Sequence, residues 1–409
     1  MLPPEIVVQI LEGLRESESP KRALQNCCLV NSVWINLAQP LLFRDLSIEH
    51  VLCSPNAWSK PRSLSTLATL LEAIVNRPDL ATFIHTLTLR RMKKWNAVDS
   101  TSALACEQNQ HIVSLLPRLT HIRSIVWVDS VFHWLTPEVQ KAIFNLFHLP
   151  SLVSLNFIGL ECRTPYDLFT NIIAGKNLRT LHLSEINFES PSRMIPSHSS
   201  TAPRSVPLTA LHLKQIDIIV VTNFLSDPNC PFSFASLSSL HLITLLHDRR
   251  SASGRTYLTN LFELLGGSVK HLVMTCSQDH STPLLEFTPF LKTLLLLNLT
   301  QNRTSNAVER VQSLFPPSPS TIESITLAIY VDKWLPWRSL DEFFANTIRF
   351  PSLRRVELWP VSTTVPSDGW IEDTKIAVEL WFPVLLRSNK LRVNPMTWNA
   401  YQRVSPNPI

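Results

Sequence analysis

Glycine is scarce in this 409-residue sequence, which holds seven glycines against thirty prolines. Neither G-x-G-x-x-G nor G-x-x-x-x-G-K occurs, so the loops with which nucleotide-binding proteins cradle phosphate are absent. Charged residues are also few, at 17%, and the net charge of +5 comes without any run of lysine or arginine. The composition therefore gives no indication of a nucleic-acid or membrane-surface partner.

Cysteine is sparse and scattered, with seven residues and no C-x-x-C pair. This excludes the common zinc and redox motifs and is typical of a reducing compartment, where thiols pack as small apolar groups. The sequence shows no secretory signal, and no apolar run approaches the roughly 20 residues of a membrane span. We expect an intracellular protein, cytoplasmic or nuclear.

A short phrase, L-x-x-L-x-L, recurs along the chain with a period near thirty residues. Alternating apolar and polar residues predict a strand with one buried face, and this period is typical of solenoids. The all-leucine copies are Leu178–Leu183, Leu208–Leu213, Leu237–Leu242 and Leu291–Leu296. Looser copies are Ile84–Leu89, Ile122–Trp127, Leu152–Phe157, Val269–Met274, Ile322–Leu327 and Leu353–Leu358, and Phe43–Ile48 fits the same template.

Helical patterns lie between these strands, which predicts parallel strands joined by right-handed crossovers. The expected helices are Ser65–Asn76, Pro137–Leu149, Tyr166–Ala174, Ile218–Leu225, Tyr257–Leu265, Ala307–Phe315 and Leu340–Ile348, followed by a capping helix at Asp373–Arg387. We predict an α/β fold, an irregular βα leucine-rich-repeat solenoid with strands on the concave face and helices outside.

The first 46 residues differ from the rest and predict three short helices, the third closed by Pro40. So small a module barely buries a core of its own, yet it carries many large apolar residues. We therefore expect it to pack against a neighbouring part of the chain or a partner protein.

These residues also resemble a known family. Leu2-Pro-Pro-Glu-Ile6, Cys28-Leu-Val30, Trp34 and Pro40-Leu-Leu-Phe-Arg44 occur in the order and near the spacing of an F-box. The resemblance implies binding to Skp1, the linker of cullin-based ubiquitin ligases. The implied Skp1-contacting residues are Leu2, Pro3, Ile6, Ile10, Leu24, Leu29, Val30 and Trp34.

The remaining chain is similar to the degenerate leucine-rich repeats of fungal F-box proteins. The resemblance thus divides the chain into an F-box at 1–46, a repeat region at 47–360 that would hold a target protein, and a cap and tail at 361–409.

Polar residues between the leucines should face the concave surface, and His182, His212 and His241 take the same slot in successive repeats. They predict either a metal-capable, pH-sensitive or peptide-recognising stripe, or ordinary polar positions of a half-exposed strand. Tryptophan is concentrated toward the C-terminus, with six of eleven at or beyond residue 334. Of these residues we expect Trp359, with Arg355, to contribute to target binding.

No pattern typical of catalysis occurs. G-x-S-x-G and H-E-x-x-H are absent, and the adjacent acids Asp341 and Glu342 fit the start of a helix. An anionic cofactor would need several inward cations, and only Arg90, Lys214 and Arg355 are expected there. We expect no enzyme, cofactor or metal, and rank a small-molecule sensor below a binding protein.

Two functions remain open at this point. The first is the substrate-recognition subunit of a Skp1–cullin–F-box ubiquitin ligase, which binds Skp1 through the F-box and a target protein through the repeats. The alternative is a leucine-rich-repeat scaffold that acts outside ubiquitin transfer.

Overall fold

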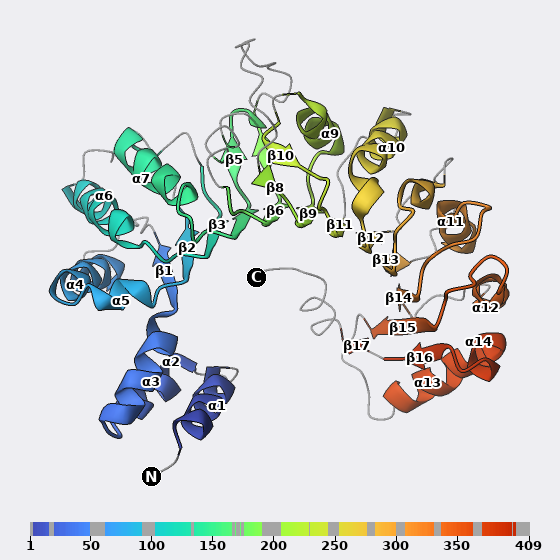
Figure 1. Cartoon of the computed structure of the whole chain (residues 1–409), viewed down its shortest axis with the longest axis horizontal. Coiled ribbons are helices and arrows are strands. Elements are labelled where there is room, and N and C mark those ends of the chain that lie inside the picture. The colour runs from blue at the N-terminus through green and yellow to red at the C-terminus, as the bar shows by residue number, and fades with distance from the viewer. Residues whose placement is uncertain are drawn as a thin grey trace. The chain divides into compact units, whose positions relative to one another are not determined.

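The structure is a computed structural model, and Figure 1 shows it as a cartoon. By compactness the chain divides into two units, unit 1 at Met1–Pro207 and unit 2 at Leu208–Ile409. The described residues are 3–15, 20–49, 62–91, 103–131, 135–165, 168, 172, 176–189, 206–228, 230–243, 253–275, 283–299, 307–330, 337–362, 370–394 and 396–397.

Unit 1 begins with a three-helix module formed by α1 (Pro4–Arg15), α2 (Pro20–Cys27) and α3 (Ser32–Phe43). Val7, Leu11, Leu24 and Ala38 form its buried core. The side chain of Asn31 accepts a hydrogen bond from the Trp34 amide at 3.1 Å and so caps the start of α3.

The expected end of the third helix at Pro40 is wrong, because α3 continues to Phe43 with Pro40 inside it. Proline removes the hydrogen bond to the carbonyl of Asn36, four residues earlier. Asn36 is exposed, so water can satisfy that carbonyl. Leu41 and Leu42 also pack against the core of the module, which favours continuation of the helix.

Five parallel strands follow in unit 1, paired in chain order. They are β1 (Asp45–Glu49), β2 (Thr86–Arg90), β3 (Ser124–Val128), β4 (Ser154–Ile158) and β6 (Thr180–Ser184). Between them lie α4 (Arg62–Asn76), α5 (Asp79–Thr82), α6 (Ala103–Leu115), η1 (Leu116–Arg118) and α7 (Pro137–Phe147), while β5 (Glu161–Cys162) pairs with β7 (Asn187–Phe188) and β8 covers Val206–Pro207. Figure 1 shows α4, α6 and α7 on one side of this sheet.

Unit 2 repeats the pattern. Its strands are β9 (Ala210–Lys214), β10 (Phe232–Ser233), β11 (Ser239–Ile243), β12 (His271–Thr275), β13 (Thr293–Leu299), β14 (Ser324–Tyr330), β15 (Arg355–Ser362), β16 (Leu391–Val393) and β17 (Met396–Thr397). Its helices are α9 (Ile218–Ser226), α10 (Ser253–Leu265), η3 (Gly266–Ser268), η4 (Leu284–Phe287), α11 (Ala307–Leu314), α12 (Trp337–Ala345), α13 (Trp370–Trp381) and α14 (Pro383–Arg387). Strands β9, β11, β12, β13, β14, β15 and β16 pair in parallel in this order, and β17 pairs with β15.

The predicted parallel α/β arrangement is confirmed, and every copy of the leucine phrase forms a strand. The described strands form no closed barrel. In β2, Leu87 and Leu89 are fully buried while Thr86 and Thr88 are half-buried, which is the expected alternation. We call the sheet face that carries Thr86, Thr88 and their equivalents the second face, because the helices pack on the other one.

Some elements differ from the expectation. The predicted helix at Asp373–Arg387 is two helices, because the chain breaks at Phe382 before Pro383. Helix α6 and strand β16 were not predicted. The predicted helix at Tyr166–Ala174 lies largely outside the described residues.

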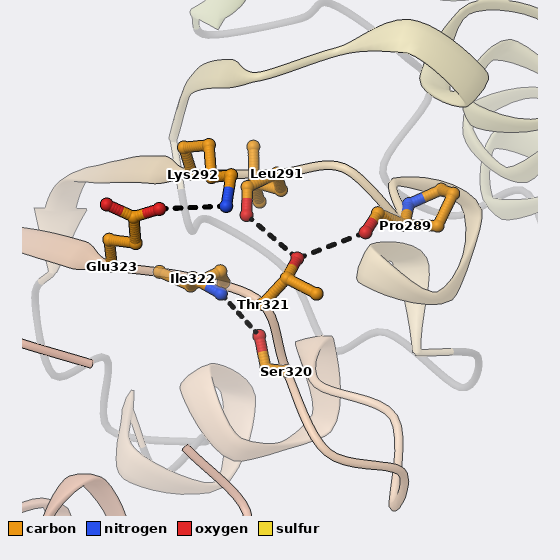
Figure 2. A network of polar contacts seen from close by, with 7 residues as sticks. All are labelled: Pro289, Leu291, Lys292, Ser320, Thr321, Ile322 and Glu323. Atoms are coloured by element: carbon orange, nitrogen blue, oxygen red, sulfur yellow. Dashed lines mark hydrogen bonds and ion pairs between the residues drawn. The ribbon is translucent and has the colours of Figure 1, made fainter. Parts of the chain in front are cut away.

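Hydrogen bonds at the amino ends of the strands set the spacing of neighbouring repeats. The carbonyl of Lys292, for example, accepts the amides of both Glu323 and Ser324, at 2.8 and 3.1 Å. Beside it the Thr321 hydroxyl bonds to the carbonyls of Pro289 and Leu291, at 3.0 and 3.1 Å (Figure 2). Equivalent bridges to the preceding repeat are made by Ser151, Asn177 and Ser268.

The carboxyl ends of the strands repeat a second feature. A residue with positive φ follows each of several strands, and its amide bonds to the last carbonyl of the next strand. The residues that make this bond are Arg91, Asp129, Gly159 and Gln215, and Glu185 shares only the positive φ. At Gly159 a side chain would be strained by its φ of +61° and would place a Cβ 2.6 Å from Oδ1 of Asp129. The repeats therefore share backbone geometry as well as the leucine phrase.

Candidate functional site

The three-helix module exposes a set of large apolar side chains. Ile6 and Ile10 are 42% and 40% exposed on α1, one turn apart, and Leu29 and Val30 are 84% and 60% exposed in the turn after α2. Exposed isoleucine and leucine at this density on so small a module are typical of a surface that a partner covers.

The predicted Skp1-contacting residues divide into exposed and buried ones. Pro3 is exposed together with the four residues above, Trp34 is half-buried, and Leu2 lies outside the described residues. Leu24 is 2% exposed and belongs to the core of the module. Leu24 would therefore support the partner-binding surface from within the core, without contacting the partner itself.

The second face of unit 2 holds two of the three predicted histidines side by side. The rings of His212 and His241 lie opposite each other on β9 and β11, with centroids 3.9 Å apart and a 36° angle between the rings. Burial lowers the pKa of His212 to about 4, so this imidazole is neutral at pH 7. His212 thus contributes an uncharged ring to an aromatic stack.

His182 belongs to unit 1, on β6, and is only 7% exposed. The expectation that it faces solvent is wrong. Ser184, two residues further along β6 on the same face, is buried as well. Adjacent strands are about 4.8 Å apart, so side chains in one row shield each other and a polar slot need not be exposed.

The predicted residues Arg355 and Trp359 are brought together by Glu357, which lies between them on β15. The Glu357 carboxylate accepts hydrogen bonds from the Arg355 guanidinium, from Trp359 Nε1 at 3.0 Å and from the Asn394 amide. Burial raises the pKa of the Glu357 carboxyl, but the bonds from Trp359, Arg355 and Asn394 outweigh it and hold the pKa below its ordinary value. The carboxylate is therefore ionised and fixes the orientation of Trp359.

An apolar cluster lies on the second face beside this carboxylate. Ile243, Leu297, Ala328 and Val361 are buried there, and Val273, Leu295 and Trp359 pack against them. Ile243 and Leu297 are 5% and 1% exposed. Trp359 thus joins the apolar cluster to the ionised Glu357, and we call this arrangement the Trp359 platform.

Sequence reasoning missed Glu357 and Asn394 as parts of this site. Glu357 lies between the predicted residues Arg355 and Trp359 on the same face of β15. Nothing in the sequence pairs it with Asn394, which is 37 residues away and follows β16. The apolar members carried a usable signal. Ile243, Val273 and Leu295 place apolar side chains at positions of the phrase that are polar in other copies.

Neither a metal centre nor a membrane span is found in the part of the chain that the structure describes. No group of three or more His, Cys, Asp or Glu side chains there is placed to hold an ion. No helix among those residues has the length and hydropathy needed to cross a bilayer.

Comparison with known proteins adds no assignment. No protein-family model matches the chain, and no curated protein matches it either.

Proposed function

We propose that this chain is an F-box-type adaptor of a Skp1–cullin–F-box ubiquitin ligase. In this proposal the three-helix module binds Skp1, and the strand–helix repeats form a leucine-rich-repeat solenoid whose second face binds a target protein. The chain itself carries out no chemistry. It raises the effective concentration of the target near the ubiquitin-loaded enzyme.

The observation that carries the proposal is the exposure of Ile6, Ile10, Leu29 and Val30 on a module whose core is only four residues. Such a module gains stability from a partner that covers these side chains, and all four are in the positions that the family resemblance implies for α1 and the turn after α2. Leu29 and Val30 are adjacent in that turn.

The Trp359 platform is the part of the repeats that we propose for target binding. Tryptophan held by a fixed hydrogen bond and bordered by Val273 and Leu295 is typical of an interface anchor, since little side-chain freedom is lost on binding. His212 and His241 lie on the same face of unit 2. His182, on unit 1, remains a predicted target-binding residue, and no contact described here supports that role.

The test is binding of the purified chain to Skp1 by calorimetry, with the double variant Ile6→Glu/Ile10→Glu. We expect this variant to weaken binding by about a hundredfold or more, because two buried contacts of a hot spot are replaced by charge. The matched control is Val75→Glu/Ile348→Glu, which places the same charges at exposed apolar residues of α4 and of the turn after α12. The control should bind like the wild type.

Two results would count against the adaptor role. One is failure of the folded wild-type chain to bind Skp1, and the other is equal binding by the Ile6→Glu/Ile10→Glu variant. Binding to Skp1 without recovery of a cullin in a pull-down would favour the scaffold alternative. Affinity purification from cells with wild type, the module variant and Trp359→Ala would then separate targets that need the platform from partners that need the module.

A further inference from the structure

One row of the repeat is enriched in basic residues. It is the residue after the first apolar residue of each phrase, at the amino end of each strand, and we call it the amino-edge row. In unit 1 its members are Arg44, His85, Arg123, Val153 and Arg179, and in unit 2 they are Thr209, Ser238, Lys270, Lys292, Glu323 and Arg354. Acid appears once in this row and a basic side chain seven times.

Backbone hydrogen bonds hold the first three members of the row side by side. The Arg44 carbonyl accepts the His85 amide at 2.9 Å, and the His85 carbonyl accepts the Arg123 amide at 2.7 Å. Their Cα atoms therefore lie at the amino ends of adjacent strands, about 4.8 Å apart, and those of the two arginines are about 10 Å apart. Both spacings are fixed by the sheet.

In unit 2, side chains at neighbouring positions of this row form an ion pair. There Glu323 occupies one place in the row and its carboxylate lies 2.8 Å from Lys292 Nζ on the neighbouring strand (Figure 2). The hydrogen bond and charge of Lys292, and the charge of Arg354, lower the pKa of Glu323. A carboxylate one strand spacing away is thus within reach of a cation in the row.

In unit 1 no described carboxylate forms an ion pair with Arg44 or Arg123. Asp79, at the same edge, is held by Arg77 at 2.7 Å. Burial and the charges of Arg123, Arg44 and His121 lower the pKa of His85, and the opposing charge of Asp45 is the smallest of these effects. The ring is therefore neutral at pH 7 and serves as a hydrogen-bonding group between two cations.

Four acidic side chains of unit 1 lie at the opposite end of the strands, whereas Asp45, the first residue of β1, lies beside the cluster. Glu49, Asp129, Glu161 and Glu185 lie at or just after the carboxyl ends, together with Arg90, Arg91 and Arg163, and Glu49 is paired with Arg91 at 2.9 Å. Two arginines thus stand beside one carboxylate, Asp45, so the cluster keeps a net positive charge, and a partner of complementary charge is the one it fits.

We propose that Arg44, His85 and Arg123 form a docking surface for an acidic helix of a partner protein. Carboxylates at positions i and i+7 of a helix are about 10.5 Å apart along its axis, which matches the two arginines. A side chain at i+3 or i+4 lies about 5–6 Å from each and meets His85. An extended peptide fits less well, because residues on one face repeat every ~6.7 Å.

A nucleic acid is the weaker candidate for this surface. Proteins that bind duplex DNA through its phosphates typically make about 6–10 such contacts, and the cluster offers two arginines and a neutral histidine. The proposal does not depend on the adaptor role, because none of the three residues belongs to the exposed apolar set of the module.

The experiment uses the purified full-length chain and two labelled helical peptides of equal composition, measured by fluorescence anisotropy at 50 mM and 200 mM salt. One peptide carries glutamate at i, i+4 and i+7, and the other at i, i+2 and i+5, where the carboxylates face different sides. We expect saturable binding of the first, at least about fivefold weaker binding of the second, and weaker binding at the higher salt.

The variant Arg44→Glu/Arg123→Glu should weaken binding of the first peptide by about tenfold or more, because two attractions become repulsions. The matched control Lys141→Glu/Arg163→Glu makes the same change of net charge at exposed residues of unit 1 and should leave binding within about twofold. If the reversal variant does not fold, as judged by circular dichroism, Arg44→Gln/Arg123→Gln replaces it, with an expected loss of about threefold or more.

Four results would overturn the proposal. They are no saturable binding of the first peptide up to 1 mM, equal binding of both peptides, an equal loss in the control variant, and binding of a single-stranded oligonucleotide of matched charge as tight as that of the peptide.

Discussion

We expect substitution of Asp341 to destabilise unit 2 more than substitution at most other positions. Its side chain is completely buried on α12, and its two carboxylate oxygens accept the amides of Val384 and Leu385, each at 2.8 Å. These amides open helix α14, which has no side-chain cap of its own. Asp341 thus caps a helix 43 residues away, and its expected role at the start of its own helix is wrong.

The cost of removing this cap follows from the two hydrogen bonds. A hydrogen bond to a charged group contributes about 1.5–3 kcal/mol, and an unsatisfied buried amide costs about 1–3 kcal/mol. Relief of the buried carboxylate's desolvation offsets part of the loss. We expect Asp341→Ala to lower the free energy of unfolding by about 2–4 kcal/mol, and Asp341→Asn, which keeps one acceptor, by about half of that.

Native-state hydrogen exchange is the direct assay, read at the Val384 and Leu385 amides. A loss of about 3 kcal/mol of local stability speeds their exchange by roughly a hundredfold. Trp337 on α12 stacks on Trp381 at 5.9 Å, so tryptophan fluorescence during urea unfolding provides a second reading at the same interface.

The control is the neighbouring residue. Glu342 is exposed and forms only a surface ion pair with Arg338, so Glu342→Ala should change stability by less than about 0.5 kcal/mol. Unchanged protection of the Val384 and Leu385 amides in Asp341→Ala would refute the capping argument.

Three further predictions concern pH and the bridges between repeats. The lowered pKa of Glu357 stabilises the fold above about pH 4.3, the unfolded value, and this contribution is lost as the pH falls through the lower folded value. Glu357→Gln should therefore cost about 1–2 kcal/mol at pH 7 and less at pH 3 in urea unfolding, and an equal cost at both pH values would contradict this. His212 has a folded pKa of about 4, so stability is full above about pH 6.5 and falls by up to about 3 kcal/mol toward pH 4. In His212→Leu that part of the pH dependence should vanish, and a pH profile parallel to the wild type would exclude this cause. Thr321→Val removes both hydroxyl bonds of the bridge and should cost about 1 kcal/mol, whereas Ser339→Ala, at an exposed helical serine, should not destabilise.

The regular part of the fold was predictable because its signal is local. In β6, for example, Leu181 and Leu183 alternate with polar residues, and this period of two fixes both the strand and its buried face. Helix α6 escaped prediction because its middle is the polar run Glu107–His111, and its position depends on packing beside α4 and α7. Strand β16 has only three residues, too few for any period to appear.

For the candidate site, the sequence predicted only which residues share a face of the sheet. The phrase places Arg355 and Trp359 on one face of β15, as the structure has them. The bonds that make them a site, from Asn394 to Glu357 and likewise from the α14 amides to Asp341, join residues far apart in sequence. Such long-range polar pairs leave no periodic trace, and side-chain shielding within a row, which buries His182, leaves none either.

The carbonyls that accept two amides at each amino edge have a consequence for how this chain can be altered. Leu272 and Leu294 are 22 residues apart and Leu87 and Ile125 are 38 residues apart, yet each pair stands directly opposite in register. Main-chain hydrogen bonds at the strand ends hold adjacent strands in register, so the segment that connects two strands can vary in length. Engineers can accordingly splice a reporter or epitope into such a stretch and leave both neighbouring rungs where they are.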